Sequence, residues 1–166
     1  MYSIISILIF ILFYNITVSS ECESNATLWT YYPCSFIITP ISFNCQHITI
    51  NSSIDQCTNR EMTFFWHFPF GNMTLTLQSD QNRPFLLRLS KPSLSSNKLI
   101  KNIYHLVHNK TSEEQLVFNN DGNAIITLYS DRYSQCSMKF ETINPNLFDY
   151  GTFIRMTVST DPSKNL

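Results

Sequence analysis

The sequence has few charges and almost no glycine. Only 14% of its 166 residues are charged and three are glycine, whereas roughly 25% of an average soluble chain is charged. There is no run of Lys or Arg, and the net charge is −1, which argues against a nucleic acid as partner because such binding needs a basic surface. A polar but largely uncharged surface is therefore expected, as in secreted glycoproteins.

Several motifs of catalysis and metal binding are also missing. The chain contains no Cys-x-x-Cys, no Gly-x-Ser-x-Gly, no phosphate-binding glycine loop and no paired-carboxylate signature of catalysis. His105 and His108 lie three residues apart, but no acidic or cysteine cluster accompanies them, and a metal site needs three or four ligands. The sequence thus predicts no catalytic residue, no metal site and no cofactor.

The first 20 residues have the pattern of a signal peptide. Ile4 to Tyr14 is an almost continuous apolar run of eleven residues, well short of the ~20 that a membrane span requires. Val18 and Ser20 suit a cleavage site before Glu21, although the segment has no Lys or Arg. An uncleaved anchor is the alternative. No later stretch is apolar enough to span a membrane, so we expect a secreted, extracellular protein.

The cysteines favour disulfides in the N-terminal third. Cys22, Cys34, Cys45 and Cys57 are spaced by 12, 11 and 12 residues, and Cys136 stands alone. We expect the four early cysteines to pair among themselves, with a bond from Cys136 to one of them as the main alternative. An unpaired Cys136 would be a buried small side chain or, less favoured, an intermolecular bridge that makes a homodimer.

Glycosylation is predicted at four sequons. Asn25, Asn51, Asn72 and Asn109 each begin an Asn-x-Ser/Thr triplet, and all four lie beside predicted turns or strand ends. Because a signal peptide would route the chain past the glycosyltransferase, we expect at least two of them to be modified.

The densest hydrophobic alternation lies between Met62 and Gln78. Phe64, Trp66 and Phe68 share one face of a predicted strand, and Leu75 and Leu77 share one face of the next. Residues 69–72 contain a proline and a glycine, which favour a reversal with positive φ at the glycine. The pattern predicts a central β-hairpin.

Further short strands are expected along the rest of the chain. Residues 115–118 and 124–130, joined by a loop with Asp-Gly, predict a second hairpin. The remaining predicted strands cover residues 35–39, 46–50, 84–90, 99–107, 136–140 and 152–159, with a short helix as the alternative for 99–107. About eight to ten strands and no amphipathic helix indicate an all-β, antiparallel β-sandwich. One domain is expected over residues 21–160, followed by a flexible tail at 161–166.

Aromatic residues make up 14% of the chain. Those of the central strand are expected in the core. Tyr31 and Tyr32 lie outside it and are the residues we expect to contact a partner, because exposed aromatic side chains bury a large area at low entropic cost.

From Cys57 onward the chain resembles the divergent CUB-like domains of secreted nematode proteins. A cysteine precedes a strand containing Trp66, an alternating strand follows at Met73 to Gln78, and residues 123–131 form a late strand ending in Ser-Asp. The acidic calcium ligands of typical CUB domains have no counterpart here, so calcium binding is not expected.

The end of the chain is also similar to an immunoglobulin variable-type domain. Asp131-Arg132-Tyr133 and Asp149-Tyr150-Gly151-Thr152-Phe153 carry this similarity, with Trp66 as the strand C tryptophan, although the strand F cysteine is absent. Both resemblances imply a β-sandwich for extracellular recognition.

These observations predict a secreted, non-enzymatic binding module, with a role in defence as one option, for an extracellular protein or glycan. A disulfide-dimerised structural or surface-coat component is the alternative. A secreted hydrolase or a lipid carrier is a third hypothesis, and it would need a deep apolar pocket.

Overall fold

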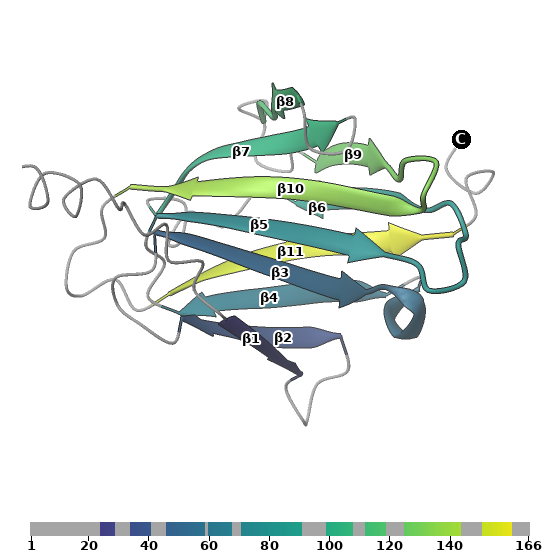
Figure 1. The fold of residues 1–166 in the computed structure, drawn as a ribbon, viewed down its shortest axis with the longest axis horizontal. Coiled ribbons are helices and arrows are strands. Elements are labelled where there is room, and N and C mark those ends of the chain that lie inside the picture. Colours follow the sequence, from purple (N-terminus) through teal and green to yellow (C-terminus); the bar gives the residue numbers. More distant parts are fainter. Residues whose placement is uncertain are drawn as a thin grey trace, which may run out of the picture.

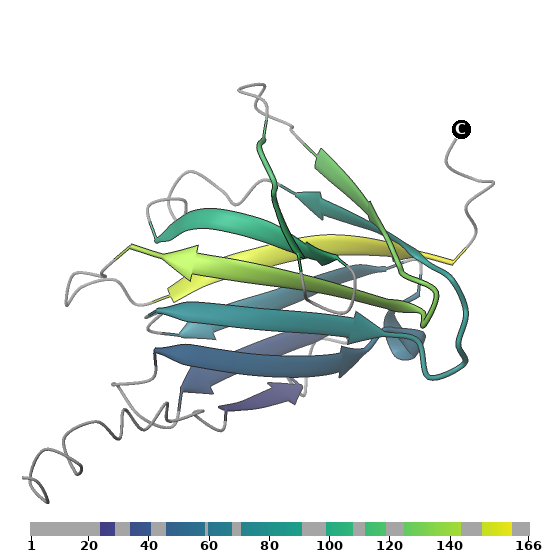
Figure 2. The same ribbon diagram turned by 45° about the horizontal axis from the view of Figure 1, so that its top comes forward.

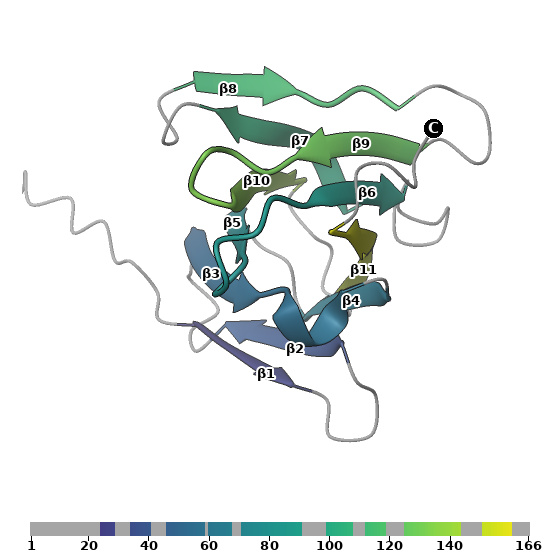
Figure 3. The ribbon, with the colours of Figure 1, turned by 90° about the vertical axis from the view of Figure 1, so that its right-hand side faces the viewer.

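A computed structural model describes residues 24–28, 34–40, 46–58, 60–67, 71–90, 99–107, 112–118, 125–143 and 151–160. Its strands form a six-stranded sheet with the order β1-β2-β4-β11-β6-β9 and a five-stranded sheet with the order β3-β5-β10-β7-β8. Seen end-on, the sheets are two facing layers (Figure 3), and most strands run along the long axis of the molecule (Figures 1 and 2). The chain is therefore a β-sandwich, as the sequence predicts.

The six-stranded sheet contains β1 (Ser24–Leu28), β2 (Ser35–Pro40), β4 (Glu61–His67), β6 (Leu86–Ser90), β9 (Ile125–Tyr129) and β11 (Gly151–Ser159). The five-stranded sheet contains β3 (His47–Ser53), β5 (Asn72–Gln78), β7 (Ile100–Val107), β8 (Ser112–Gln115) and β10 (Gln135–Thr142). A single 3₁₀ turn, η1 (Asp55–Cys57), interrupts the strands in the described part of the chain, and no described helix is long and apolar enough to cross a membrane.

The core lies between the two layers and is built by alternation along the strands. Phe64 and Trp66 of β4 are fully buried, as predicted; Phe68 lies outside the described residues. Strands of both sheets supply the other large buried side chains, among them Met73, Leu75, Leu77, Leu87, Leu89, Met138, Phe140, Ile154 and Met156. The periodicity thus identifies which side of most strands faces inward.

The predicted central hairpin is wrong. β4 pairs with β2 and β11 in one sheet, and β5 pairs with β3 and β10 in the other. Gly71 does have the expected positive φ, 69°, and its carbonyl accepts hydrogen bonds from the amide and hydroxyl of Thr142, at 3.0 and 2.8 Å. Because both arms present a large apolar face, they stack across the core through side chains instead of pairing through their backbones.

The second predicted hairpin is also wrong. β8 pairs with β7 in the five-stranded sheet, whereas β9 pairs with β6 in the six-stranded sheet. The segment predicted as a tight turn, residues 119–123, lies outside the described residues. The strands on either side of it belong to different layers.

The sheets are mixed, and not purely antiparallel as predicted. β2 pairs with β4 and β3 pairs with β5 in parallel. The connections from β2 to β3, β3 to β4 and β4 to β5 each cross to the other sheet. After two successive crossings the chain is back in the same sheet and runs in the same direction as before. For this reason β4 lies parallel to β2, and β5 lies parallel to β3.

Candidate functional site

An aromatic cluster lies on the outer side of the six-stranded sheet. In β4, Phe64 and Trp66 point inward, so Phe65 and His67 point outward. In the sheet register Phe65 stands between Ile37 of β2 and Phe153 of β11. The rings of Phe65 and Phe153 are 4.5 Å apart, and that of His67 is 4.6 Å from Phe65. We call Ile37, Phe65, His67 and Phe153, with neighbouring Arg155, the outer aromatic patch.

The patch combines apolar surface with polar groups at its border. Phe153 is 37% exposed, and the Arg155 guanidinium lies 5.7 Å from the centre of its ring. Arg155 is also 4.0 Å from the carboxylate of Glu61, and the hydroxyl of Thr39 lies 3.2 Å from Nδ1 of His67. Such a surface suits a partner that brings both apolar and hydrogen-bonding groups.

Gly151 makes room for this arrangement. A Cβ at position 151 would lie 2.6 Å from the ring of Phe65 and 2.9 Å from the carbonyl oxygen of Trp66. The glycine therefore lets the Phe65 ring lie close to the backbone of β11.

The same outer side is apolar again at the β9 edge of the sheet. Ile125 and Tyr129 of β9 are 57% and 65% exposed, and the register places them on the same face as Arg88. Large exposed apolar groups thus occur at two places on this layer, a distribution associated with interaction surfaces.

The outer side of the five-stranded sheet differs, because its charges pair with one another. Lys139 Nζ lies 3.1 Å from Glu113 and 3.2 Å from Glu141. The amide of Asn102 donates to Glu141 at 3.1 Å. This hydrogen bond is the largest of the effects that lower the pKa of Glu141, and the hydrogen bonds from Lys139 and Tyr104 act in the same direction. This network is satisfied internally and offers few free groups to a ligand.

The predicted partner contacts Tyr31 and Tyr32 lie outside the described residues, so their contribution stays a prediction. Sequence reasoning missed Phe65 and Phe153. The signal was present in the alternation of β4, because inward Phe64 and Trp66 require Phe65 to face outward.

Cys34 and Cys57 form a disulfide with a Cα–Cα distance of 5.5 Å, so two of the four early cysteines are joined. Cys22 and Cys45 lie outside the described residues. Cys136 is a free thiol, buried in the core, and this burial raises its pKa to about 12.

The sequons have different surroundings. Asn51 is exposed on β3, and Asn72 is half-buried at the start of β5. Asn25 lies in β1 with its backbone opposite Thr39, and Asn109 lies outside the described residues. Glycosylation at all four positions stays a prediction.

No group of three or more metal-ligating side chains occurs among the described residues. His105 is half-buried on β7, and this burial lowers its pKa despite the opposing charge of Glu114. His47 lies 3.5 Å from the hydroxyl of Thr74. His108 lies outside the described residues.

Comparison with known proteins gives no relative: no protein-family model matches the chain, and no curated protein is similar to it in sequence.

Proposed function

We propose that this protein is a secreted, non-enzymatic recognition module that binds an extracellular protein or glycan through the outer aromatic patch. The observation behind the proposal is the contact between Phe65 and Phe153 on a sheet face that points away from the core. Aromatic side chains at such positions supply much of the binding energy in protein interfaces because they bury a large area at low entropic cost.

Secretion is supported by the signal-like segment, the sequons and the Cys34–Cys57 disulfide, a bond that persists in oxidising compartments. Of the two resemblances, the immunoglobulin-like one agrees less well with the strand pairing and the disulfide. Immunoglobulin domains have antiparallel sheets and a disulfide packed against the strand C tryptophan, whereas this chain has two parallel pairings and a disulfide that joins the residue before β2 to η1.

The alternatives gain less support. Cys136 would have to leave the core to bridge two chains, because it is only 2% exposed, which weighs against a disulfide-linked coat component. A hydrolase or lipid carrier would need a deep apolar cavity. Trp66, Phe64 and Phe140 fill the space between the described strands instead.

The secretory part of the proposal is tested by the intact mass of the protein secreted from eukaryotic cells, before and after deglycosylation. We expect a chain that starts at Glu21 and carries glycans. An unglycosylated chain with five free thiols would contradict secretion.

The recognition part is tested by screening the secreted protein against panels of extracellular proteins and glycans. The double variant F65S/F153S is compared with V117S, which removes a 74% exposed apolar side chain after β8. We expect binding to be lost in F65S/F153S and kept in V117S, with both variants folded. Ligands that bind all three proteins equally would contradict a role for the patch.

A further inference from the structure

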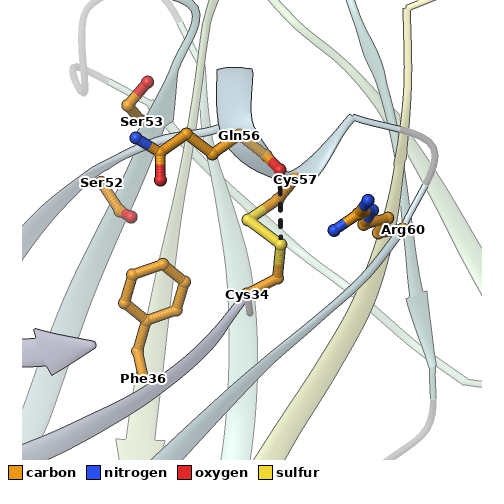
Figure 4. Close-up of a pocket in the computed structure, with 7 residues that line it drawn as sticks. All are labelled: Cys34, Phe36, Ser52, Ser53, Gln56, Cys57 and Arg60. Carbon is orange, nitrogen blue, oxygen red and sulfur yellow. Dashed lines mark hydrogen bonds between the residues drawn. A yellow bond between two sulfur atoms is a disulfide. The ribbon is translucent and has the colours of Figure 1, made fainter. Parts of the chain in front are cut away.

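A pocket of about 400 Å³ lies at one end of the sandwich, where β2, the end of β3 and η1 meet. Its lining residues are Cys34, Phe36, Ser52, Ser53, Gln56, Cys57 and Arg60. Figure 4 shows Phe36, Ser52 and Gln56 on one side of the disulfide and Arg60 on the other, with its guanidinium pointing toward the sulfur atoms. The volume is in the range of small-molecule sites, about 300–1,000 Å³.

The pocket has a polar wall at a position where the sheet pattern calls for an apolar one. Ile48 and Ile50 point inward from β3 and are almost fully buried, and Ser52 continues the same alternation. Its hydroxyl has no hydrogen-bond partner among the described residues. Neither do the side-chain amide of Gln56 and the guanidinium of Arg60. Three unpaired polar groups therefore surround one concavity.

The part of the pocket formed by Phe36 and the disulfide is apolar. The ring of Phe36 stacks on that of the buried Phe64 at a centroid distance of 4.9 Å and an angle of 14°. The disulfide between Cys34 and Cys57 fixes the floor, and both cysteines are buried. One disulfide sulfur lies 3.7 Å from the carbonyl oxygen of Gln56; since it has no proton, this is a polar contact and not a thiol hydrogen bond. The pocket is thus held in shape without a ligand.

Arg60 supplies the charge of the pocket. No described carboxylate lies within ion-pair distance of its guanidinium. The two nearby acids are engaged elsewhere: Asp55 accepts from the Ser79 hydroxyl and the Asp80 amide, both at 2.9 Å, and Asp80 accepts from the Ser53 hydroxyl at 2.7 Å. Asp80 is bonded to Ser53, which lines the pocket, so its negative charge lies close to any ligand there. It would repel a dianion more than a monoanion.

We infer that this pocket binds a small monocarboxylate with a flat apolar part. The planar guanidinium of Arg60 matches a carboxylate through two parallel hydrogen bonds, Ser52 and Gln56 add donors, and the apolar part lies against Phe36. The site is separate from the outer aromatic patch and does not depend on the proposed function.

The test uses benzoate as probe, with benzamide as its neutral counterpart and inorganic phosphate as a competing anion. Binding to the full secreted chain is measured by ligand-observed NMR titration. Two variants change the pocket: R60Q removes the charge, and R60K keeps the charge but loses the planar pair of guanidinium donors. Two variants are controls: K101Q removes a charge at the opposite end of the sandwich, and F153S changes the outer aromatic patch.

We expect saturable benzoate binding that weakens at least tenfold in R60Q, weakens less in R60K and changes less than twofold in K101Q and F153S. Benzamide binding should be the same in R60Q and wild type. Equal benzoate affinity of R60Q and wild type, absence of saturation, or tighter binding of phosphate would overturn the inference. Because Arg60 has no described side-chain partner, R60Q should keep the wild-type melting temperature, which serves as the folding control.

Discussion

The Cys34–Cys57 disulfide should contribute strongly to stability in the N-terminal third. It closes a loop with a sequence separation of 23 residues that contains all of β3. It also joins the start of β2 to the turn before β4, and these two strands are parallel neighbours. The bond thus restricts the unfolded chain over the segment that forms β2 and β3.

The magnitude follows from loop closure. For a loop of 23 residues, the chain-entropy relation gives about 3.4 kcal/mol at 25 °C. The variant C34A/C57A loses this contribution, together with two buried sulfur atoms that are each worth on the order of 1 kcal/mol. Cys136 provides a matched control because it is equally buried but free.

The assay is urea unfolding followed by tryptophan fluorescence, to which the buried Trp66 contributes, for wild type, C34A/C57A and C136A. We expect C34A/C57A to lose free energy of unfolding through the missing bond and through two missing sulfur atoms. After twice the loss of C136A is subtracted to correct for the sulfur atoms, the remaining loss should be about 3.4 kcal/mol. The m-value should also rise, because the unfolded chain becomes less compact. A difference below about 1 kcal/mol with an unchanged m-value would refute the loop-closure reasoning.

Three further predictions concern single residues. Burial holds the pKa of Cys136 at about 12 against an ordinary 9.0, so the folded state keeps a proton that the unfolded state loses, and stability should fall above pH 9. At pH 10 we expect the free energy of unfolding of wild type to have fallen by about 1.4 kcal/mol more than that of C136A. If the free energies of both proteins change with pH in parallel, the prediction is wrong. G71A should lose at least ~2 kcal/mol in urea unfolding, because φ is 69° and a Cβ would overlap the carbonyl of Gln46; a wild-type midpoint would be inconsistent with that backbone. Burial lowers the pKa of His105, so the folded state resists protonation, and the free energy of unfolding should fall as the pH drops below about 6.5, the ordinary pKa of histidine. The free energy of unfolding of H105Q should depend less on pH in this range. An equally steep dependence in H105Q would contradict the prediction.

Local alternation was sufficient to predict most strands and their inward faces. Leu87 and Leu89 of β6, and Ile154, Met156 and Val158 of β11, alternate along segments predicted as strands, and all five are buried. This succeeds because a strand with one side in a core needs a period of two regardless of its neighbours.

Strand partners could not be predicted in the same way. The stretches around residues 62–78 and 115–130 look like hairpins because each has two strands and a turn-forming loop. Whether such strands pair or face each other across the core depends on contacts with distant segments, such as β10 with β5 and β11 with β4. The parallel pairs follow from that choice and leave no local trace in the sequence.

The candidate sites were predictable only in part. The outward position of Phe65 follows from its neighbours, but its contact with Phe153 requires the pairing of β4 with β11, 88 residues apart along the chain. The pocket around Arg60 depends on the approach of β2, β3 and η1, which no single motif encodes.

The central claim is that the outer aromatic patch binds the partner of this protein. The most direct test is the dissociation constant of the strongest ligand from the screen, measured for wild type, F153S and V117S. Loss of a central aromatic contact costs about 2 kcal/mol or more, so F153S should bind at least roughly 30-fold more weakly while V117S binds like wild type. Equal dissociation constants for wild type and F153S would contradict the claim.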